Sequence, residues 1–159
     1  MLDIIVPKKI TYFFDLIRFG KPIGFMLFMW PCWFALAYIP LNQIELIHWY
    51  IYFAIGAFLM RSAGCIINDL VDINLDKNIE RTALRPLTSK KISILEAVLL
   101  LFVLVFLSLI ILLQFQTNTI LIGLTSIPLV IFYPYMKRYT NWPQLCLGLT
   151  FNWGVLIVS

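Results

Sequence analysis

Long apolar stretches separated by short polar ones dominate this sequence. Two of them, residues 46–67 and 92–113, reach the roughly 17–25 residues that a helix needs to cross a bilayer. Three others, residues 23–39, 120–136 and 145–159, are shorter but equally apolar. The pattern predicts an all-α fold, a polytopic transmembrane helical bundle of about five spans.

The composition agrees with a membrane protein. Hydrophobic residues make up 62% of the chain and charged residues only 13%, about half the charged share of a soluble domain. We therefore interpret residues 1–159 as a single membrane domain, whose one long polar segment is an aspartate-rich loop at residues 68–91. The net charge of +4 reflects the placement of basic residues around the spans, and no nucleic-acid partner is expected.

The basic residues predict the orientation of the chain. All twelve Lys and Arg residues fall at or near one end of the predicted spans. The connections at the other end, residues 40–45 and 114–119, carry none. Under the positive-inside rule, the N-terminus and loop 68–91 are then cytoplasmic, and a bacterial inner (plasma) membrane is the expected location. The charged first 20 residues lack an apolar signal-peptide core, so no cleavable signal is expected.

Four side chains suited to a metal begin where the second span ends: Asn68, Asp69, Asp72 and Asp76. On one continuous helix, 100° per residue places Asn68, Asp72 and Asp76 within about 80° of one another, with Asp69 nearby. Carboxylates at this spacing repel one another, so the arrangement requires cations. Mg²⁺ is the natural candidate because it binds one or two carboxylates and keeps positions open for substrate phosphates.

Basic and aromatic side chains could complete such a site. Arg61 lies on the same helical face but deeper in the span, where an arginine indicates function unless it merely snorkels to the interface. Arg81 and Arg85, four residues apart, suit a diphosphate, although they could serve only as topology determinants. Tyr133 and Lys137 share a face if their helix continues through the proline between them; ordinary interfacial anchoring is the alternative.

Together these segments resemble the UbiA superfamily of membrane prenyltransferases. The stretch from Met60 to Pro86 is similar to its first aspartate-rich motif, followed by R-T-x-x-R-P. Further segments are similar to the 4-hydroxybenzoate polyprenyltransferase branch: Lys21–Gly24 with Trp30–Pro31, Tyr133–Tyr139, and Pro143–Gly148. The resemblance implies the N-terminal part of a nine-helix bundle, with a central cavity open sideways to lipid.

The resemblance also implies an activity and a set of roles. The activity is Mg²⁺-dependent transfer of a polyprenyl group from polyprenyl diphosphate to 4-hydroxybenzoate, a C-prenylation of ubiquinone biosynthesis performed within the lipid bilayer. The implied metal ligands are Asn68, Asp69, Asp72 and Asp76. The implied substrate-binding residues are Arg61, Arg81, Arg85, Tyr133 and Lys137, and the implied catalytic residues are Asp72, Asp76, Arg61 and Lys137.

One feature departs from the family pattern. The family carries a second aspartate-rich motif in its C-terminal half, whereas no Asp follows Asp76 here. We therefore expect a truncated or split family member, inactive alone or completed by a second chain. Two alternatives stay open: another UbiA-type transferase of the haem-O or menaquinone kind, and a non-catalytic remnant or small ion-binding membrane bundle.

Overall fold

The structure is a computed structural model that describes residues 8–77, 80–139 and 142–158. Within these ranges, the side chains of Arg81, Pro134, Lys137, Arg138, Tyr139 and Pro143 are not described. The described residues form helices and no strands, which confirms the predicted all-α fold. In chain order the helices are α1 (Lys8–Leu16), α2 (Ile23–Leu36), α3 (Gln43–Val71), α4 (Ile73–Asp76), α5 (Glu80–Ala83), α6 (Ile94–Leu112), α7 (Thr117–Tyr139) and α8 (Pro143–Val158).

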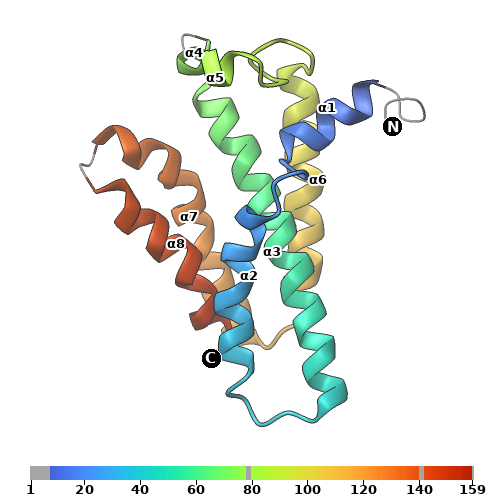
Figure 1. The fold of residues 1–159 in the computed structure, drawn as a ribbon. Coiled ribbons are helices and arrows are strands. Elements are labelled where there is room, and N and C mark those ends of the chain that lie inside the picture. Colours follow the sequence, from blue (N-terminus) through green and yellow to red (C-terminus); the bar gives the residue numbers. More distant parts are fainter. Residues whose placement is uncertain (1–7, 78–79, 140–141, 159) are drawn as a thin grey trace.

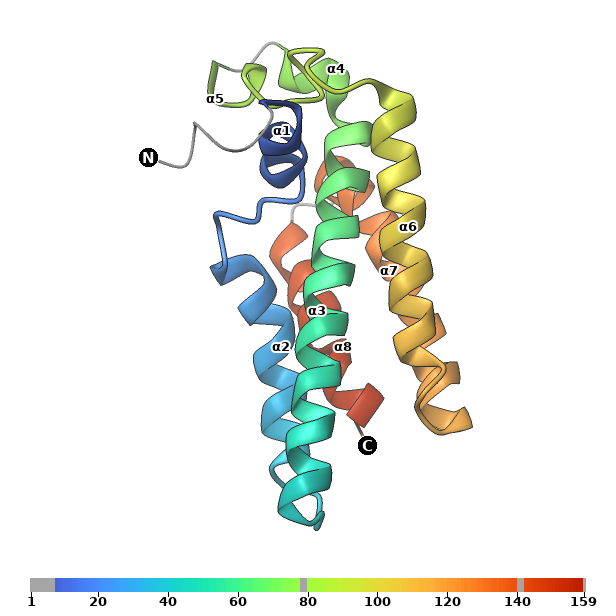
Figure 2. The ribbon, with the colours of Figure 1, turned by 90° about the vertical axis from the view of Figure 1, so that its right-hand side faces the viewer.

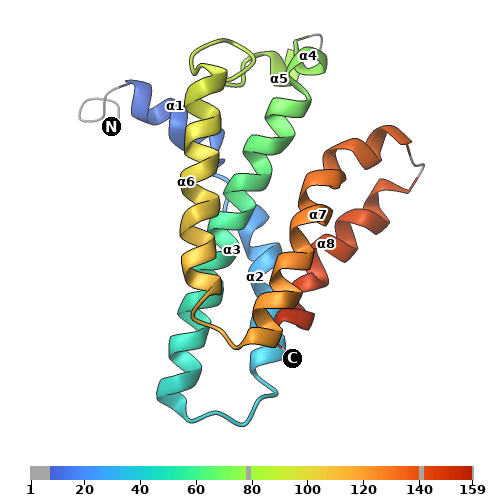
Figure 3. The same ribbon diagram turned by 180° about the vertical axis from the view of Figure 1, so that it is seen from behind.

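The long helix α3 is the central element. It packs against α2, α6 and α7, while α8 packs against α2 and α7 (Figures 1 and 2). Toward the end where α4 and α5 lie, the α7–α8 hairpin leans away from α3 (Figures 1 and 3). Helices α1, α4 and α5 and the start of α6 therefore gather at one end of the bundle, around the end of α3.

Local side-chain caps explain where α3 and α6 begin. Asn42 precedes α3, and its side-chain oxygen accepts a hydrogen bond from the Glu45 amide at 2.9 Å. Ser93 and Glu96 form a capping box at α6, in which each side chain accepts a hydrogen bond from the other residue's backbone amide, at 3.2 and 2.9 Å. These caps satisfy amides that have no partner within the helix.

Two described helices, α3 and α6, are long and apolar enough to cross a membrane, and α2, α7 and α8 contain shorter apolar segments. Helix α6 is apolar on its exposed faces as well: Phe102 is 71% and Leu95 68% exposed. A helix that is apolar all round is usually buried in a core or in lipid. Since the protein covers little of α6, we interpret its outer surface as lipid-facing.

The observed helix bounds differ from the sequence-based spans at the functional end. Helix α3 runs through Val71, so Asn68 and Asp69 belong to its last turn and the predicted loop 68–91 begins inside a helix. The rest of that segment contains α4 and α5. Helix α7 continues through Pro134 to Tyr139. The sequence analysis did not predict the nine-residue α1.

Helix α1 lies across the end of the bundle, beside α4 and α5 (Figures 1 and 2). Lys9 Nζ forms an ion pair with Glu96 Oε1 of α6 at 2.5 Å, and Lys91 Nζ lies 4.9 Å from the centre of the Tyr12 ring. Leu16, at the end of α1, is fully buried in the same cluster as Ile66, next to the last turn of α3. These contacts hold α1 against the bundle, and so they set the position of the segment that connects α1 to α2.

We expect Gly154→Ala to destabilise the packing of α8 against α2. A Cβ atom at Gly154 would overlap Cys32 Sγ and lie 3.7 Å from the Phe28 carbonyl oxygen. Forcing a group into such a contact costs about 1–3 kcal/mol of unfolding free energy, measurable by chemical denaturation in detergent. Gly148→Ala on the same helix is the matched control, since nothing lies within 4 Å of its Cβ position. If Gly154→Ala and Gly148→Ala are equally stable, the close contact of Gly154 with Cys32 on α2 is contradicted.

Candidate functional site

The aspartates lie where α3 passes into α4. Asp72 leaves helical geometry, with φ −94° and ψ 3°, so the single continuous helix assumed for the run is interrupted at that residue. Backbone hydrogen bonds still connect the run: the Asp72 amide donates to the Asn68 carbonyl at 3.0 Å, and the Asp76 amide donates to the Asp72 carbonyl at 2.8 Å. Asp69, Asp72 and Asp76 are all buried, each at most 5% exposed.

Arginine side chains supply positive charge to two of these carboxylates. Arg85 Nη1 donates to Asp69 Oδ1 at 2.9 Å and to Asp76 Oδ2 at 2.7 Å. Arg18 Nη2 donates to the same Asp69 oxygen at 2.9 Å. Charge-assisted hydrogen bonds of this length are roughly twice as strong as neutral ones. The chain itself therefore provides positive charge beside Asp69 and Asp76.

The pairing of Arg18 was missed by the sequence analysis, which counted it only among the basic residues that set the orientation. Arg18 lies in the connection between α1 and α2 with φ 56°, a left-handed conformation that is uncommon for a residue with a side chain. Its amide donates to the Asp15 carbonyl at 3.1 Å, and its carbonyl accepts from the Lys21 amide at 2.9 Å. No sequence pattern near Arg18 indicates a partner 51 residues away.

Arg85 is positioned by the turn that follows α5. Its amide donates to the Thr82 carbonyl at 3.1 Å, and its carbonyl accepts hydrogen bonds from both the amide and the hydroxyl of Ser89, at 2.9 and 2.8 Å. The Thr82 hydroxyl donates to the Asp76 carbonyl at 3.1 Å, which ties α5 to the end of α4. Buried Leu87 anchors this turn in the core.

Arg61 lies deeper on α3, beside α2. A Cβ atom on Gly24 would lie 2.6 Å from Arg61 Nε, so the glycine of the K-P-I-G segment is what lets the guanidinium approach α2. Arg61 Nη1 also contacts Cys65 Sγ. A small pocket here is lined by Arg18, Lys21 and Arg61 together with aromatic side chains. The pocket has a volume of about 10 Å³, no more than one water molecule needs, and its three cations make this part of the protein positively charged.

The remaining predicted residues lie elsewhere or outside the description. Tyr133 is half-buried on α7, one turn from residue 137 of the same helix. The side chains of Arg81 and Lys137 lie outside the described part of the chain. Helix α7 approaches α3 closely at Gly64, where a Cβ atom would lie 3.8 Å from Val130 Cγ1. The described contacts thus join Asp69, Asp76, Arg85 and Arg18, with Arg61 nearby.

The described donors fit a hard divalent cation in their chemistry. Asp69, Asp72 and Asp76 are buried carboxylates, the ligand type that Mg²⁺ prefers. Asp69 and Asp76 are set around a guanidinium nitrogen, and among the described residues no three His, Cys, Asp or Glu side chains stand in a metal-binding arrangement. The donor types therefore suit the cation, but their arrangement in this structure does not, because Arg85 occupies the place between two of them.

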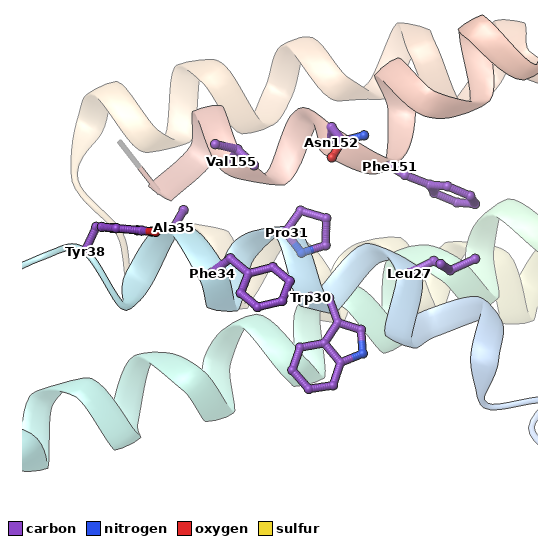
Figure 4. A pocket seen from close by; sticks show the side chains of 9 residues that line it. All are labelled: Leu27, Trp30, Pro31, Phe34, Ala35, Tyr38, Phe151, Asn152 and Val155. Atoms are coloured by element: carbon purple, nitrogen blue, oxygen red, sulfur yellow. The ribbon is translucent and has the colours of Figure 1, made fainter.

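A separate apolar groove of about 490 Å³ runs between α2 and α8. In Figure 4, Pro31 and Ala35 of α2 lie on the side toward Asn152 and Val155 of α8, whereas the Trp30 ring, which also lines the groove, extends away from α8. Its lining residues carry no charge and include none of the ion-paired side chains. Such a surface suits a hydrocarbon chain rather than a diphosphate.

Comparison with known proteins identifies related sequences. Residues 28–159 match the UbiA prenyltransferase family. The chain is 47% identical over 152 residues to a mitochondrial 4-hydroxybenzoate polyprenyltransferase of Caenorhabditis elegans, covering 95% of this chain and 43% of the relative. It is 39% identical over 151 residues to a 4-hydroxybenzoate octaprenyltransferase of Pseudoalteromonas translucida, covering 95% and 51%. The chain thus spans about half or less of the length of these relatives. No solved structure matches it.

We expect Asp69→Asn to destabilise the chain. The substitution removes the negative charge between two guanidinium groups, which would then face each other across a neutral amide. Breaking a buried ion pair costs about 3–5 kcal/mol, and we expect about 3 because both arginine side chains keep part of their exposure. Chemical denaturation in detergent measures the change. Asp15→Asn, on the exposed side of α1, should change stability by less than about 0.5 kcal/mol.

Proposed function

Because this chain belongs to the UbiA prenyltransferase family, we propose that it transfers a polyprenyl group from polyprenyl diphosphate to 4-hydroxybenzoate. Both relatives described above carry names for this activity. The observation that carries the proposal is the buried carboxylate cluster with its arginines, at one end of a membrane helix.

The proposed reaction exchanges one bond for another. The bond between the first prenyl carbon and the diphosphate oxygen breaks, and the diphosphate leaves with the electron pair. The allylic cation is attacked by the ring carbon ortho to the hydroxyl of 4-hydroxybenzoate, and that carbon then loses its proton. Charge develops on the departing diphosphate, so preorganised positive groups around it lower the barrier.

The residues of this chain divide these tasks by position. Asn68, Asp69, Asp72 and Asp76 would hold Mg²⁺, which when bound neutralises charge on the diphosphate. Arg81 and Arg85 would bind the diphosphate oxygens through their guanidinium groups. Arg61, beside the small aromatic pocket, would orient the carboxylate of the acceptor.

Tyr133 and Lys137, on the part of α7 that leans away from the end of α3, would contribute to the site from that hairpin. The prenyl tail requires apolar surroundings that also keep water from the cation. The groove between α2 and α8 is one apolar surface of suitable character (Figure 4).

The end of the bundle that carries the cluster is proposed to be cytoplasmic, in a bacterial plasma membrane. Basic side chains of α1, of the α1–α2 connection and of the segment after α4 lie at this end. The connections at the other end, residues 37–42 and 113–116, contain no Lys or Arg. Retention of Lys and Arg on the cytoplasmic side accounts for this distribution.

We expect Asp72→Ala and Asp76→Ala to weaken Mg²⁺-dependent binding of a prenyl thiodiphosphate analogue by at least about a hundredfold. Each substitution removes an oxygen ligand from the cation, and even changes behind the ligands cost about 10–100-fold. Isothermal titration of the chain in lipid nanodiscs measures the affinity.

Asp15→Ala, an exposed acid of the same charge, is the control and should bind as the parent does. The proposed site is contradicted if binding of the analogue does not depend on Mg²⁺, or if Asp72→Ala and Asp76→Ala both bind it with the parent affinity. Repeating the titration with 4-hydroxybenzoate and with benzoate, which lacks the hydroxyl, tests the acceptor.

We further expect cysteines placed at Lys77 and at Asn42 to be labelled from opposite sides of the membrane. Lys77 follows α4 and Asn42 precedes α3, so they lie at opposite ends of the bundle. On a background without Cys32, Cys65 and Cys146, an impermeant maleimide added outside intact cells should label only the Asn42→Cys protein. External labelling of Lys77→Cys would reverse the proposed orientation.

A further inference from the structure

We propose that Arg85 acts as a removable internal cation. In this structure its guanidinium fills the place between Asp69 and Asp76, and binding of a divalent cation to these carboxylates would release it toward the diphosphate. This inference rests on the proposed function and adds a sequence of binding steps to it. The cation binds the carboxylates first, and Arg85, displaced from them, then becomes available to bind the diphosphate.

The first argument is geometric. A single nitrogen, Arg85 Nη1, binds Asp69 Oδ1 and Asp76 Oδ2, at 2.9 and 2.7 Å. A cation bridging these two carboxylates needs the same oxygen lone pairs and the same space. Arg85 and a bridging cation therefore exclude each other, whereas the diphosphate role proposed for Arg85 requires its guanidinium to be free.

The second argument is a count of charges. Asp69 and Asp76 carry two negative charges, and the guanidinium groups of Arg18 and Arg85 that contact them carry two positive charges. Adding a dication while Arg85 stays would leave these four groups with an excess of two positive charges and bring like charges into contact. If Arg85 leaves, that excess falls to one. Exchange is thus favoured over simple addition, because buried charges are tolerated only when they are balanced.

The contacts also distinguish Arg85 from Arg18. Among the described acidic side chains, Arg18 contacts Asp69 alone, so it can remain in place while a cation binds toward Asp76. The backbone of Arg85 is held independently of its side chain, by the Thr82 and Ser89 hydrogen bonds, and a quarter of the side chain is exposed. The guanidinium can therefore rotate out of the cluster while its backbone stays fixed.

Two consequences can be measured. Cation and diphosphate each favour the released arginine, so the binding of one strengthens the binding of the other by the same factor. A cation alone must first displace Arg85 and therefore binds weakly. Removing the guanidinium removes this competition, so substituting Arg85, although it is proposed to bind the diphosphate, should strengthen cation binding.

The test uses Mn²⁺ as the probe, with the chain in lipid nanodiscs and no diphosphate present. Electron paramagnetic resonance of free Mn²⁺ gives the affinity. We expect Arg85→Gln to bind Mn²⁺ about tenfold more tightly than the parent chain, because a positive charge in contact with the ligands is lost. Lys77→Gln removes one charge from an exposed residue just after Asp76 and should change the affinity by less than about twofold. Mn²⁺ should also raise the melting temperature of Arg85→Gln more than that of the parent.

If Arg85→Gln does not fold, Arg85→Lys takes its place in the test. A single ammonium group bridges Asp69 and Asp76 less well than a guanidinium, so this variant should show a smaller increase in Mn²⁺ affinity. Unchanged or weaker Mn²⁺ binding in the folded variants overturns the inference. Adding Asp76→Asn separates this failure from failure of the proposed function. If Mn²⁺ binding to the parent and to Arg85→Gln is insensitive to Asp76→Asn, the metal site itself is wrong. If it is sensitive but Arg85 has no effect, only the exchange is wrong.

Discussion

Three carboxylates buried within two helical turns, at the end of a membrane-spanning helix, are the constraint on which the rest of this end of the molecule depends. Uncompensated carboxylates cannot be buried in an apolar medium without a large penalty. The counter-charges of Asp69 and Asp76 come from other segments of the chain, Arg18 before α2 and Arg85 after α5. Both segments must therefore fold back over the end of α3, and the apolar anchors Leu16 and Leu87 hold them there.

The same constraint gives a physical reason for short motifs that are otherwise only signatures. Gly24 is small because Arg61 lies against it, and the turn at Arg18 adopts a left-handed conformation while its side chain reaches Asp69. The turn after α5 uses Ser89 to hold the Arg85 carbonyl, so the side chain alone faces the carboxylates. The K-P-I-G segment thus makes room for Arg61, and the R-P segment positions Arg85 beside the carboxylates.

The sequence predicted what depends on local pattern and failed where distant segments meet. Apolar stretch lengths predicted the helices, and the aspartate run predicted a site that needs cations, since both follow from spacing along one element. Helix α1 was missed because nine amphipathic residues carry no span-length signal. The pairing of Arg18 and the double contact of Arg85 were missed because they join residues up to 51 positions apart. The break at Asp72 was missed because its hydrogen bonds nearly preserve the helical path.

A site for a highly charged ligand must also be stable before the ligand arrives. A cluster of bare carboxylates would repel itself and destabilise the folded chain, while permanently paired carboxylates could not bind a metal. Arginines that pair with the carboxylates in one state and with the substrate in another satisfy both demands, because the guanidinium binds carboxylate and phosphate with the same fork of donors. The contacts of Arg85 match this solution: it holds Asp69 and Asp76 together, and its side chain is among the more exposed members of the cluster. On this view the aspartates and arginines form one exchangeable charge system, in which folding and substrate binding use the same oxygen atoms.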